Sequence, residues 1–407
     1  MSRLPIYMDN HATTRVDPRV VAAMLPFFDS VYGNAGSVGH IFGEQARQAV
    51  DAARAVVASS LGASPREIIF TSGATESNNL AIRGVVERAR RRGNHLLSVS
   101  TEHKSVLDPL DRLSRRGFEV TLLDVSQLQA SDADPASGGG WLDPQKVEAA
   151  IRDETALVSV MLANNEIGTL QPLAEIGRIC RQRGVPLHCD ATQAVGKIPV
   201  DVQDLQVDLL SFTAHKIYGP KGIGGLYARR QGGGVRLQSQ IDGGGQEGGL
   251  RSGTLNVPGI VGLAAALELC LAEMPAEAAR LSALRNRLHA GLTAELADVT
   301  LNGPPLDASA GDTARRLPGN LNLSFAYVDG EALMMSIKDL AVSSGSACTS
   351  ANPEPSHVLR ALGIGDDLTR ASLRFGLGRF NTAEDVEFAI SAVSEAVRRL
   401  RKLSSMA

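Results

Sequence analysis

Two residues near the middle of the chain could together bind an aldehyde cofactor. Lys216 follows the apolar segment 207–212, and Asp190 ends the apolar segment 185–189. The spacing, 216 − 190 = 26 residues, is about one strand–helix–strand unit, so both side chains can emerge at the same edge of a parallel sheet. A desolvated lysine can form a Schiff base, and a carboxylate can keep a pyridine nitrogen protonated. Lys216 alone could be a solvated loop residue and Asp190 alone a helix cap, but the pair points to pyridoxal 5′-phosphate.

A phosphate group would need a cradle, and a segment rich in small residues offers one. Residues 71–79, Thr-Ser-Gly-Ala-Thr-Glu-Ser-Asn-Asn, follow an apolar run that ends at Phe70 and open a helical pattern. Small residues let backbone N–H groups approach an anion, and the N-terminus of a helix favours negative charge. The same residues could instead form only an ordinary helix cap with a capping box.

Three further polar residues follow the ends of apolar runs, namely His103, Asn165 and Gln193. An imidazole at this edge could stack on a cofactor ring, and the two amides could hydrogen-bond a ring hydroxyl or a substrate carboxylate. Each could also serve only its own loop or turn.

Cys348 and Arg374 are the last two candidates. Cys348 lies in a run of small residues, 343–350, whereas a core cysteine usually lies among large apolar ones. An accessible thiol suits nucleophilic attack when its thiolate is available, and a passive exposed thiol is the alternative. Arg374 lies in an apolar, strand-like segment, where a planar guanidinium needs a carboxylate partner. That partner could belong to a substrate or to a structural ion pair.

The elements that must position these residues alternate in kind from about residue 50 to 265. Short apolar runs predict buried strands, and between them lie amphipathic helical patterns such as 173–183, closed by Gly184. The strand candidates are residues 67–70, 95–99, 156–161, 185–189 and 207–212. This alternation predicts an α/β domain around a mostly parallel sheet.

The pattern of predicted helices and strands changes after about residue 265. A long helical stretch, 260–296, leads to short strands near Val299 and at 321–325, and a terminal helix spans about 383–403. These elements predict a smaller α+β domain.

Composition excludes several classes of protein. The 407 residues are 43% hydrophobic and 21% charged, as in ordinary globular proteins. The net charge of −3 leaves no basic excess for binding nucleic acid. Four cysteines without a C-x-x-C pair argue against a zinc site or a disulfide scaffold. Residues 1–10 lack the pattern of a secretory signal, and the apolar stretch 260–267 is shorter than the roughly 20 residues that span a bilayer. We therefore expect a cytoplasmic protein with neither a membrane nor a nucleic acid as direct partner.

The chain resembles the cysteine desulfurases, which are pyridoxal-phosphate enzymes of the class V aminotransferase group. The resemblance runs from Asp-Asn-His-Ala-Thr-Thr at 9–14 to Arg-Phe-Gly-Leu-Gly-Arg at 374–379. The motifs that carry it lie at residues 71–79, 101–103, 163–168, 188–197, 215–225, 251–254 and 343–350. The long cysteine-bearing loop is similar to that of the housekeeping and nitrogen-fixation type.

The resemblance implies an architecture. Residues 15–264 would form a large cofactor-binding domain around a mostly parallel seven-stranded sheet. Residues 1–14 and 265–407 would form a smaller α+β domain that carries the loop with the catalytic cysteine. The enzyme would be a homodimer, because Thr254 would reach the cofactor phosphate of the second subunit.

The resemblance also implies a role for each candidate residue. Lys216 would hold the cofactor covalently and move the Cα proton of the substrate. Asp190 would pair with the pyridine nitrogen, His103 would stack on the ring, and Gln193 would contact the ring hydroxyl. The phosphate would be bound by Ala74, Thr75, Thr213, His215 and Thr254. The α-carboxylate of L-cysteine would be held by Asn165 and Arg374. No metal site is implied.

On this reading Cys348 would attack the substrate sulfur, keep it as a persulfide and release L-alanine. The sulfur would pass to acceptor proteins such as an iron–sulfur scaffold or a tRNA-thiolation relay. Two alternatives stay open on the sequence. One is a selenocysteine lyase or another class V activity, and the other is a sulfur-carrier or regulatory protein with a vestigial site.

Overall fold

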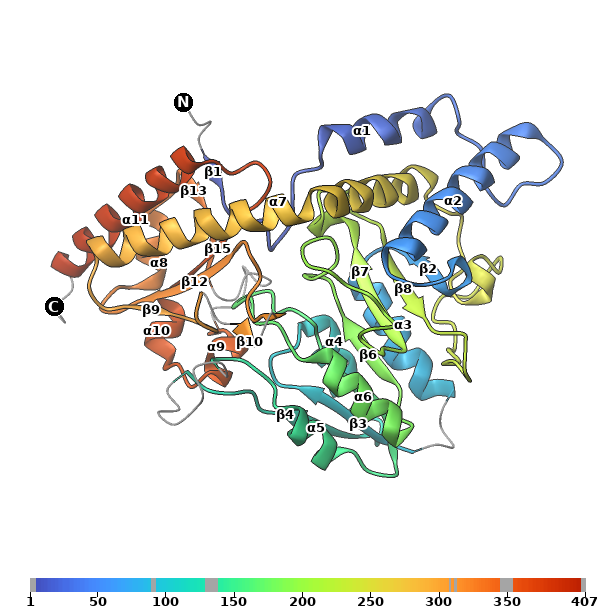
Figure 1. Cartoon of the computed structure of the whole chain (residues 1–407), viewed down its shortest axis with the longest axis horizontal. Helices are drawn as coiled ribbons and strands as arrows, with labels where there is room; N and C mark the ends of the chain where they lie inside the picture. The colour runs from blue at the N-terminus through green and yellow to red at the C-terminus, as the bar shows by residue number, and fades with distance from the viewer. Residues whose placement is uncertain are drawn as a thin grey trace.

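The computed structural model describes residues 5–88, 93–128, 138–306, 309–310, 313–344 and 354–403. Its larger part is built on a seven-stranded sheet with the strand order β2-β8-β7-β6-β5-β3-β4 (Figure 1). The strands are β2 (Ile68–Thr71), β3 (His95–Val99), β4 (Glu119–Leu123), β5 (Thr155–Ser159), β6 (Leu187–Asp190), β7 (Leu209–Thr213) and β8 (Gly224–Ala228). Only β8 runs antiparallel to its neighbours, which confirms the predicted mostly parallel sheet.

The strands are buried because successive side chains supply two different hydrophobic clusters. On β2, Ile68 and Phe70 join one cluster, while Ile69 between them joins the other. Leu97 and Leu96 of β3 divide in the same way. Alternation along a strand therefore fills both faces, and near-continuous apolar runs result.

Helices cover this sheet and several of them begin at side-chain caps. His40, His103 and Asp143 each cap the helix that follows, and Gly184 ends α6 with a φ of 65°. The α-helices of this part are α1 (Pro18–Met24), α2 (Ile41–Ser60), α3 (Ala74–Arg88), α4 (Lys104–Ser114), α5 (Pro144–Ala150) and α6 (Leu173–Arg183). The 3-10 turns are η1 (Leu25–Phe28), η2 (Pro65–Glu67), η4 (Ala214–Lys216) and η5 (Glu247–Gly249).

The remaining strands form smaller sheets. An antiparallel sheet has the order β14-β15-β12-β9, and two pairs, β1-β13 and β10-β11, lie apart from it. These strands are β1 (Ile6–Tyr7), β9 (Val299–Leu301), β10 (Ser309–Ala310), β11 (Thr313–Ala314), β12 (Asn320–Phe325), β13 (Leu340–Ala341), β14 (Ser343–Ser344) and β15 (Ser372–Gly376). The helices are α8 (Gly330–Ser336), α9 (His357–Ala361), α10 (Asp366–Arg370) and α11 (Ala383–Leu403). Parallel pairing of β1 with β13 joins the N-terminal residues to this C-terminal part.

One long helix, α7 (Val257–Glu295), runs through both parts (Figure 1). Its first half supplies Ile260, Leu263 and Cys270 to the core of the large sheet, and its second half supplies Leu288 and Leu292 to the core of the smaller part. By length and composition α7 could cross a membrane, so its apolar character extends beyond the stretch read from the sequence. Half of its most apolar window is buried by the rest of the chain, which marks it as a core helix here.

The proposed domain boundary at residue 264 falls inside α7. The side chains of α7 change from one core to the other between Cys270 and Leu281. Val358 and Leu359 of α9 also pack in the core of the large sheet. We retain the two-domain division as a proposal in which α7 is common to both domains.

Candidate active site

A cavity of about 530 Å³ opens beyond the carboxyl ends of β6 and β7, where open parallel sheets bind ligands. Most of the residues selected from the sequence line it, namely Ala74, Thr75, His103, Asn165, Asp190, Gln193, Thr213, His215, Lys216 and Arg374. Thr254 is exposed and does not line this cavity. Cys348 lies outside the described residues.

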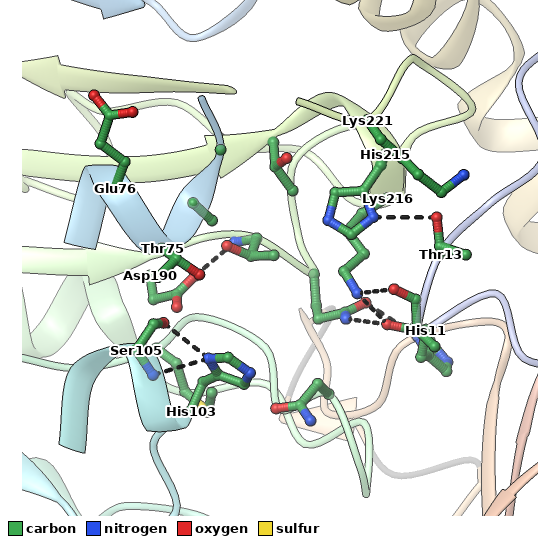
Figure 2. Close-up of a pocket in the computed structure, with 18 of the residues that line it drawn as sticks. His11, Thr13, Thr75, Glu76, His103, Ser105, Asp190, His215, Lys216 and Lys221 are labelled. Carbon is green, nitrogen blue, oxygen red and sulfur yellow. Dashed lines mark hydrogen bonds between the residues drawn. The ribbon is translucent and has the colours of Figure 1, made fainter. Parts of the chain in front are cut away.

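Lys216 ends the η4 turn directly after β7 and projects across the cavity (Figure 2). Its Nζ donates a hydrogen bond to the backbone oxygen of His11 at 2.6 Å and another to that of Ala12. Both acceptors belong to the N-terminal segment, which the pairing of β1 with β13 brings across the molecule. The lysine is thereby held by backbone dipoles in the centre of the site.

Asp190, the last residue of β6, is buried with 4% of its surface exposed. Its Oδ1 accepts a hydrogen bond from the backbone N–H of Thr192 at 2.9 Å, and its Oδ2 accepts one from Asn78 Nδ2 at 2.8 Å. These two donors fix the plane of the carboxylate. A buried carboxylate in a fixed plane can hold a protonated ring nitrogen.

Asn78 also connects this carboxylate to the imidazole of His103. Its amide donates to Ser105 Oγ at 2.8 Å, and Ser105 in turn contacts His103 Nδ1 through its hydroxyl (2.8 Å) and its backbone N–H (3.1 Å). Because Nδ1 accepts from this N–H, the neutral ring carries its proton on Nε2. Burial lowers the pKa of His103, which favours that neutral form.

Part of the cavity lining could hold a phosphate. The first turn of α3 presents Ala74 and Thr75 to the cavity, and Thr213 and His215 also line it. The Glu76 carboxylate pairs with Arg251 at 2.8 Å, so its charge is compensated. Burial and the charge of Lys216 lower the pKa of His215 to about 4, and a bound anion would favour its protonation.

Gln193 and His11 form a pair whose proton positions can be deduced. Gln193 Oε1 accepts from the Lys197 ammonium at 2.7 Å and lies 3.1 Å from His11 Nδ1, while Gln193 Nε2 donates to the His11 backbone oxygen at 2.9 Å. An ammonium cannot accept, so the amide oxygen faces Lys197 and His11 Nδ1 must carry a hydrogen. Burial lowers the pKa of His11, so its ring is neutral and Nε2 is a bare acceptor.

Arg374 on β15 supplies a guanidinium that is 1% exposed. It donates to the backbone oxygen of Asn165 at 3.0 Å, to Asp9 Oδ1 at 2.8 Å and to Ser343 Oγ at 3.3 Å. Its Nε is buried without a partner among the described residues. The arginine therefore has a structural ion pair, as one reading of the sequence expected, and also lines the cavity.

The site fits pyridoxal phosphate on its own chemistry. It combines an inward lysine, a fixed carboxylate, an imidazole and a helix N-terminus in one cavity. Three residues that line it, His11, Thr192 and Arg374, carry buried polar atoms that lack a partner among the described residues. Such atoms are costly unless a ligand satisfies them.

Several residues that hold this arrangement together are not among the candidates from the sequence, and chief among them are His11, Asn78, Glu102, Ser105, Glu166 and Lys197. Asn78 and Asp190 lie 112 positions apart, and His11 and Gln193 lie 182 apart. Their polar side chains and their positions within the motifs could have identified them as site residues. Their hydrogen-bond partners cannot be deduced from local spacing.

Comparison with known proteins agrees with the geometry. The family model for class-V aminotransferases matches residues 6–388. A cysteine desulfurase, IscS, of Anaeromyxobacter dehalogenans is 56% identical over 404 residues, covering 99% of this chain and 95% of the relative. IscS of Klebsiella pneumoniae is 51% identical with the same coverage.

Solved structures give the same result. A NifS-like protein superposes with a TM-score of 0.86 at 36% identity, covering 97% of this chain and all of the other. SspA in complex with cysteine superposes with a TM-score of 0.77 at 37% identity, over 92% and 99% of the two chains. Both the fold and the cofactor chemistry of the site are therefore those of pyridoxal-phosphate enzymes. The chain belongs to the class-V aminotransferase family and, within it, to the cysteine desulfurases.

Proposed function

We propose that this enzyme converts L-cysteine to L-alanine and transfers the sulfur, through a persulfide on Cys348, to acceptor proteins. The observation that carries the proposal is that one cavity collects Lys216, Asp190, His103 and Arg374 from separate elements of the chain. The 56% identity to a cysteine desulfurase over nearly the whole chain supports the same substrate.

Each residue has a task that follows from its position. Pyridoxal phosphate, when bound, supplies an electron sink that stabilises negative charge at the substrate Cα. Asp190 holds the ring nitrogen in its protonated form, and His103 covers the ring. Gln193 lies on the same wall, where it can contact the ring hydroxyl. The first turn of α3, Thr213 and His215 bind the phosphate. Lys216 binds the cofactor covalently and moves the Cα proton.

Arg374 and Asn165 orient the substrate. A guanidinium fork binds a carboxylate at two points, which fixes the direction of the remaining substrate atoms. The cysteine sulfur is then presented to the attacking thiol in a defined geometry, and positioning of this kind lowers the barrier.

The transfer to Cys348 balances without an external oxidant. A sulfur–sulfur bond forms between the Cys348 thiolate and the substrate sulfur, and the substrate bond between Cβ and sulfur breaks with its electrons left on carbon. Cβ takes up a proton, so the carbon is reduced while the sulfur is oxidised to the persulfide level. L-Cysteine and one thiol thus yield L-alanine and one persulfide.

We further propose that the enzyme works as a homodimer. The N-terminal segment from α1 to the start of α2 leaves a set of large apolar side chains exposed, namely Val21, Leu25, Phe28, Tyr32, Val38, Ile41 and Phe42. Exposed apolar patches of this kind mark protein interfaces. Thr254 is exposed and lies outside the cavity of its own chain, which supports its proposed contact with the cofactor phosphate of a second subunit.

We place the enzyme in the cytoplasm, with a persulfide acceptor such as an iron–sulfur scaffold or a tRNA-thiolation relay as its partner. The name of the relatives, IscS, is consistent with iron–sulfur assembly. A persulfide sulfur is labile to thiols, so a protein thiol or an assembly scaffold is the chemistry that would take it.

The test is turnover of L-cysteine by the purified enzyme with a thiol reductant, with alanine and sulfide quantified together. Equal amounts of the two products are expected, and Cys348→Ser should lose them while it still binds cofactor and cysteine. Pyruvate in place of alanine would indicate a lyase. Faster turnover of selenocysteine with Cys348 dispensable would indicate a selenocysteine lyase.

A further inference from the structure

One face of strand β12 is polar, although the whole strand is buried. Its apolar side chains join the core of the smaller part, and between them lie Asn320, Asn322 and Ser324, each 0% exposed. A buried amide costs free energy unless it is hydrogen-bonded. The proposed function uses none of these residues, so the partners of the two asparagines show what the polar face is for.

Both asparagines bind one backbone carbonyl beside a proposed substrate-binding residue. Asn320 Nδ2 donates to the backbone oxygen of Glu166 at 3.1 Å, and Asn322 Nδ2 donates to the same atom at 3.2 Å. Glu166 directly follows Asn165 in the turn 165–167. The polar face of β12 is therefore bonded to the turn that carries Asn165.

The carbonyls on either side of this one are held in the same way. Arg374 donates to the backbone oxygen of Asn165 at 3.0 Å, and Arg316 donates to that of Ile167 at 2.9 Å. Arg316 precedes β12, and Arg374 lies on the neighbouring strand β15. Three consecutive carbonyls of a turn that follows β5 of the large sheet are thus bonded to side chains of the smaller part.

The rest of the turn agrees with this docking. Asn164 Oδ1 accepts from the backbone N–H groups of Glu166 (2.8 Å) and Ile167 (3.0 Å), so the turn satisfies its own donors and leaves its carbonyls for the smaller part. Gly168 has a φ of 72°, and a Cβ on it would lie 2.6 Å from the side-chain carbon of Asn320. The turn therefore packs directly against β12.

Asn322 connects the two residues proposed to hold the substrate carboxylate. It lies directly opposite Arg374 in the pairing of β12 with β15, and residues opposite each other in an antiparallel pair project from the same face. Asn165 and Arg374 line the active-site cavity, whereas Asn322 does not. Asn322 can therefore influence a bound substrate only through its neighbours.

We propose that Asn322, together with Asn320, is a positioning residue for the substrate α-carboxylate. By fixing the turn 165–167 on the smaller sheet, the two amides set the separation between the Asn165 side chain and the Arg374 guanidinium. A carboxylate that is held from two sides needs its donors at a fixed separation. This inference rests on the proposed carboxylate-binding role of Asn165 and Arg374. Cofactor affinity should not depend on Asn322, because other elements hold the cofactor.

The experiment separates substrate binding from the chemical steps in the holoenzyme. Asn322→Ala should raise KM for L-cysteine about threefold to tenfold, the scale of one lost hydrogen bond, as measured by sulfide release. The value of kcat should change by less than about twofold, since the carboxylate is bound equally in the ground state and the transition state. The inhibition constant of L-alanine, which keeps the carboxylate, should rise by the same factor as KM. An unchanged KM would overturn the proposal.

Asn302 supplies the matched control. It is also 0% exposed, and its Nδ2 donates to Asn322 Oδ1 and Ser324 Oγ, both at 2.8 Å. Among the described residues these side-chain hydrogen bonds stay on the polar face of β12 and do not reach the turn. Asn302→Ala should therefore lose stability but keep the KM of the wild type. Equal rises in KM for the two variants would mean that a loosened sheet is the cause, which contradicts positioning by Asn322.

A double-mutant cycle tests whether Asn322 acts through Asn165. Asn165→Ala alone should raise KM, and adding Asn322→Ala should raise it little further, because residues that act through one another are not additive. Factors that simply multiply would refute the positioning role. If neither Asn165→Ala nor Arg374→Lys raises KM, the proposed binding of the carboxylate fails instead. Where Asn322→Ala does not fold, Asn320→Ala removes the other donor to the same carbonyl and takes its place in the cycle.

Discussion

Asn78 on α3 donates a hydrogen bond to the Asp190 carboxylate on β6 at 2.8 Å. The same amide nitrogen donates to Ser105 Oγ, which holds the imidazole of His103. One side chain on α3 therefore sets the position of the carboxylate from β6 relative to the ring at the start of α4. The cofactor would therefore bind between groups that are already hydrogen-bonded to one another before it arrives.

Replacing Asn78 should weaken the binding of the cofactor. In Asn78→Ala the buried Asp190 carboxylate loses a donor, and a lost hydrogen bond to a buried charge costs about 1.5–3 kcal/mol. We expect cofactor affinity to fall roughly tenfold or more, measured by equilibrium dialysis followed by absorbance. Asn79→Ala is the control, because Asn79, in the part of the chain that the structure describes, donates to the backbone oxygen of Thr75 within the same helix. Equal losses in the two variants would contradict a specific role for Asn78.

Arg374 should govern substrate affinity. Lysine in its place keeps the charge but loses the fork that binds a carboxylate at two points. Arg374→Lys should raise KM for L-cysteine roughly tenfold to a hundredfold, on the scale of a charged hydrogen bond, as measured by steady-state alanine release. Arg379→Lys should lower stability and leave KM unchanged, since Arg379 pairs with Asp17 and Glu277 and does not line the cavity. An unchanged KM in Arg374→Lys would remove Arg374 from substrate binding.

Glu102 should tolerate loss of its charge. Its Oε1 accepts from the backbone N–H of Met161, and its Oε2 is buried without a partner among the described residues. Burial, followed by repulsion from Asp190, raises the pKa of Glu102 well above its usual range, which favours the protonated carboxyl. Glu102→Gln has nearly the same shape and should change the free energy of unfolding by less than about 1 kcal/mol. Denaturant titration of the two proteins is the check, and a much larger loss would mean that the ionised form is needed.

Glu166 should make stability depend on pH near neutrality. Burial raises its pKa from 4.5 to about 7, although a hydrogen bond from Ser356 at 2.5 Å opposes that shift. Between these two values the folded state binds more protons than the unfolded state, so this group lowers stability as pH rises through that window. The full effect approaches about 3 kcal/mol, at 1.36 kcal/mol for each pKa unit.

Calorimetry across that window can isolate this contribution. Glu166→Gln keeps an acceptor for Ser356 but cannot ionise, so its stability should fall less than that of the wild type as pH rises. Buried histidines such as His188, with a pKa lowered to about 4, act with the opposite sign in both proteins and cancel in the comparison. Parallel curves for the two proteins would show that Glu166 does not titrate there.

The sequence predicts the regular elements where a local pattern dominates. The helix at 173–183 with its Gly184 terminus and the last helix at 383–403 are both confirmed at their residues. Strands β4 and β8 are not predicted. β4 is an edge strand with a mostly half-exposed surface, and β8 begins with two glycines that pack against β7 and the turn at Gly73. Neither shows the apolar run that marks a buried strand.

The chemistry of the site is predictable to a similar extent. Lys216, Asp190 and Arg374 are recognisable because each is a charged residue beside an apolar run, and the structure brings them to one cavity. The residues that orient them are not, because their contacts depend on tertiary structure. Lys197 follows Gln193 by four residues, yet its link to Lys216 passes through His11, far away in the sequence.

The pairing of β1 with β13 has a consequence for the order in which the enzyme is made. Ile6 leaves the ribosome long before its partner Leu340, which lies 340 − 6 = 334 residues later in the chain. At 5–20 residues per second, the N-terminal segment waits on the order of tens of seconds before its strand can form. His11 and Ala12, whose carbonyls hold Lys216, belong to that segment. The seven-stranded sheet, whose last strand ends at Ala228, can therefore assemble during translation, while the carbonyl contacts that hold Lys216 form only after residues 340–341 have been made.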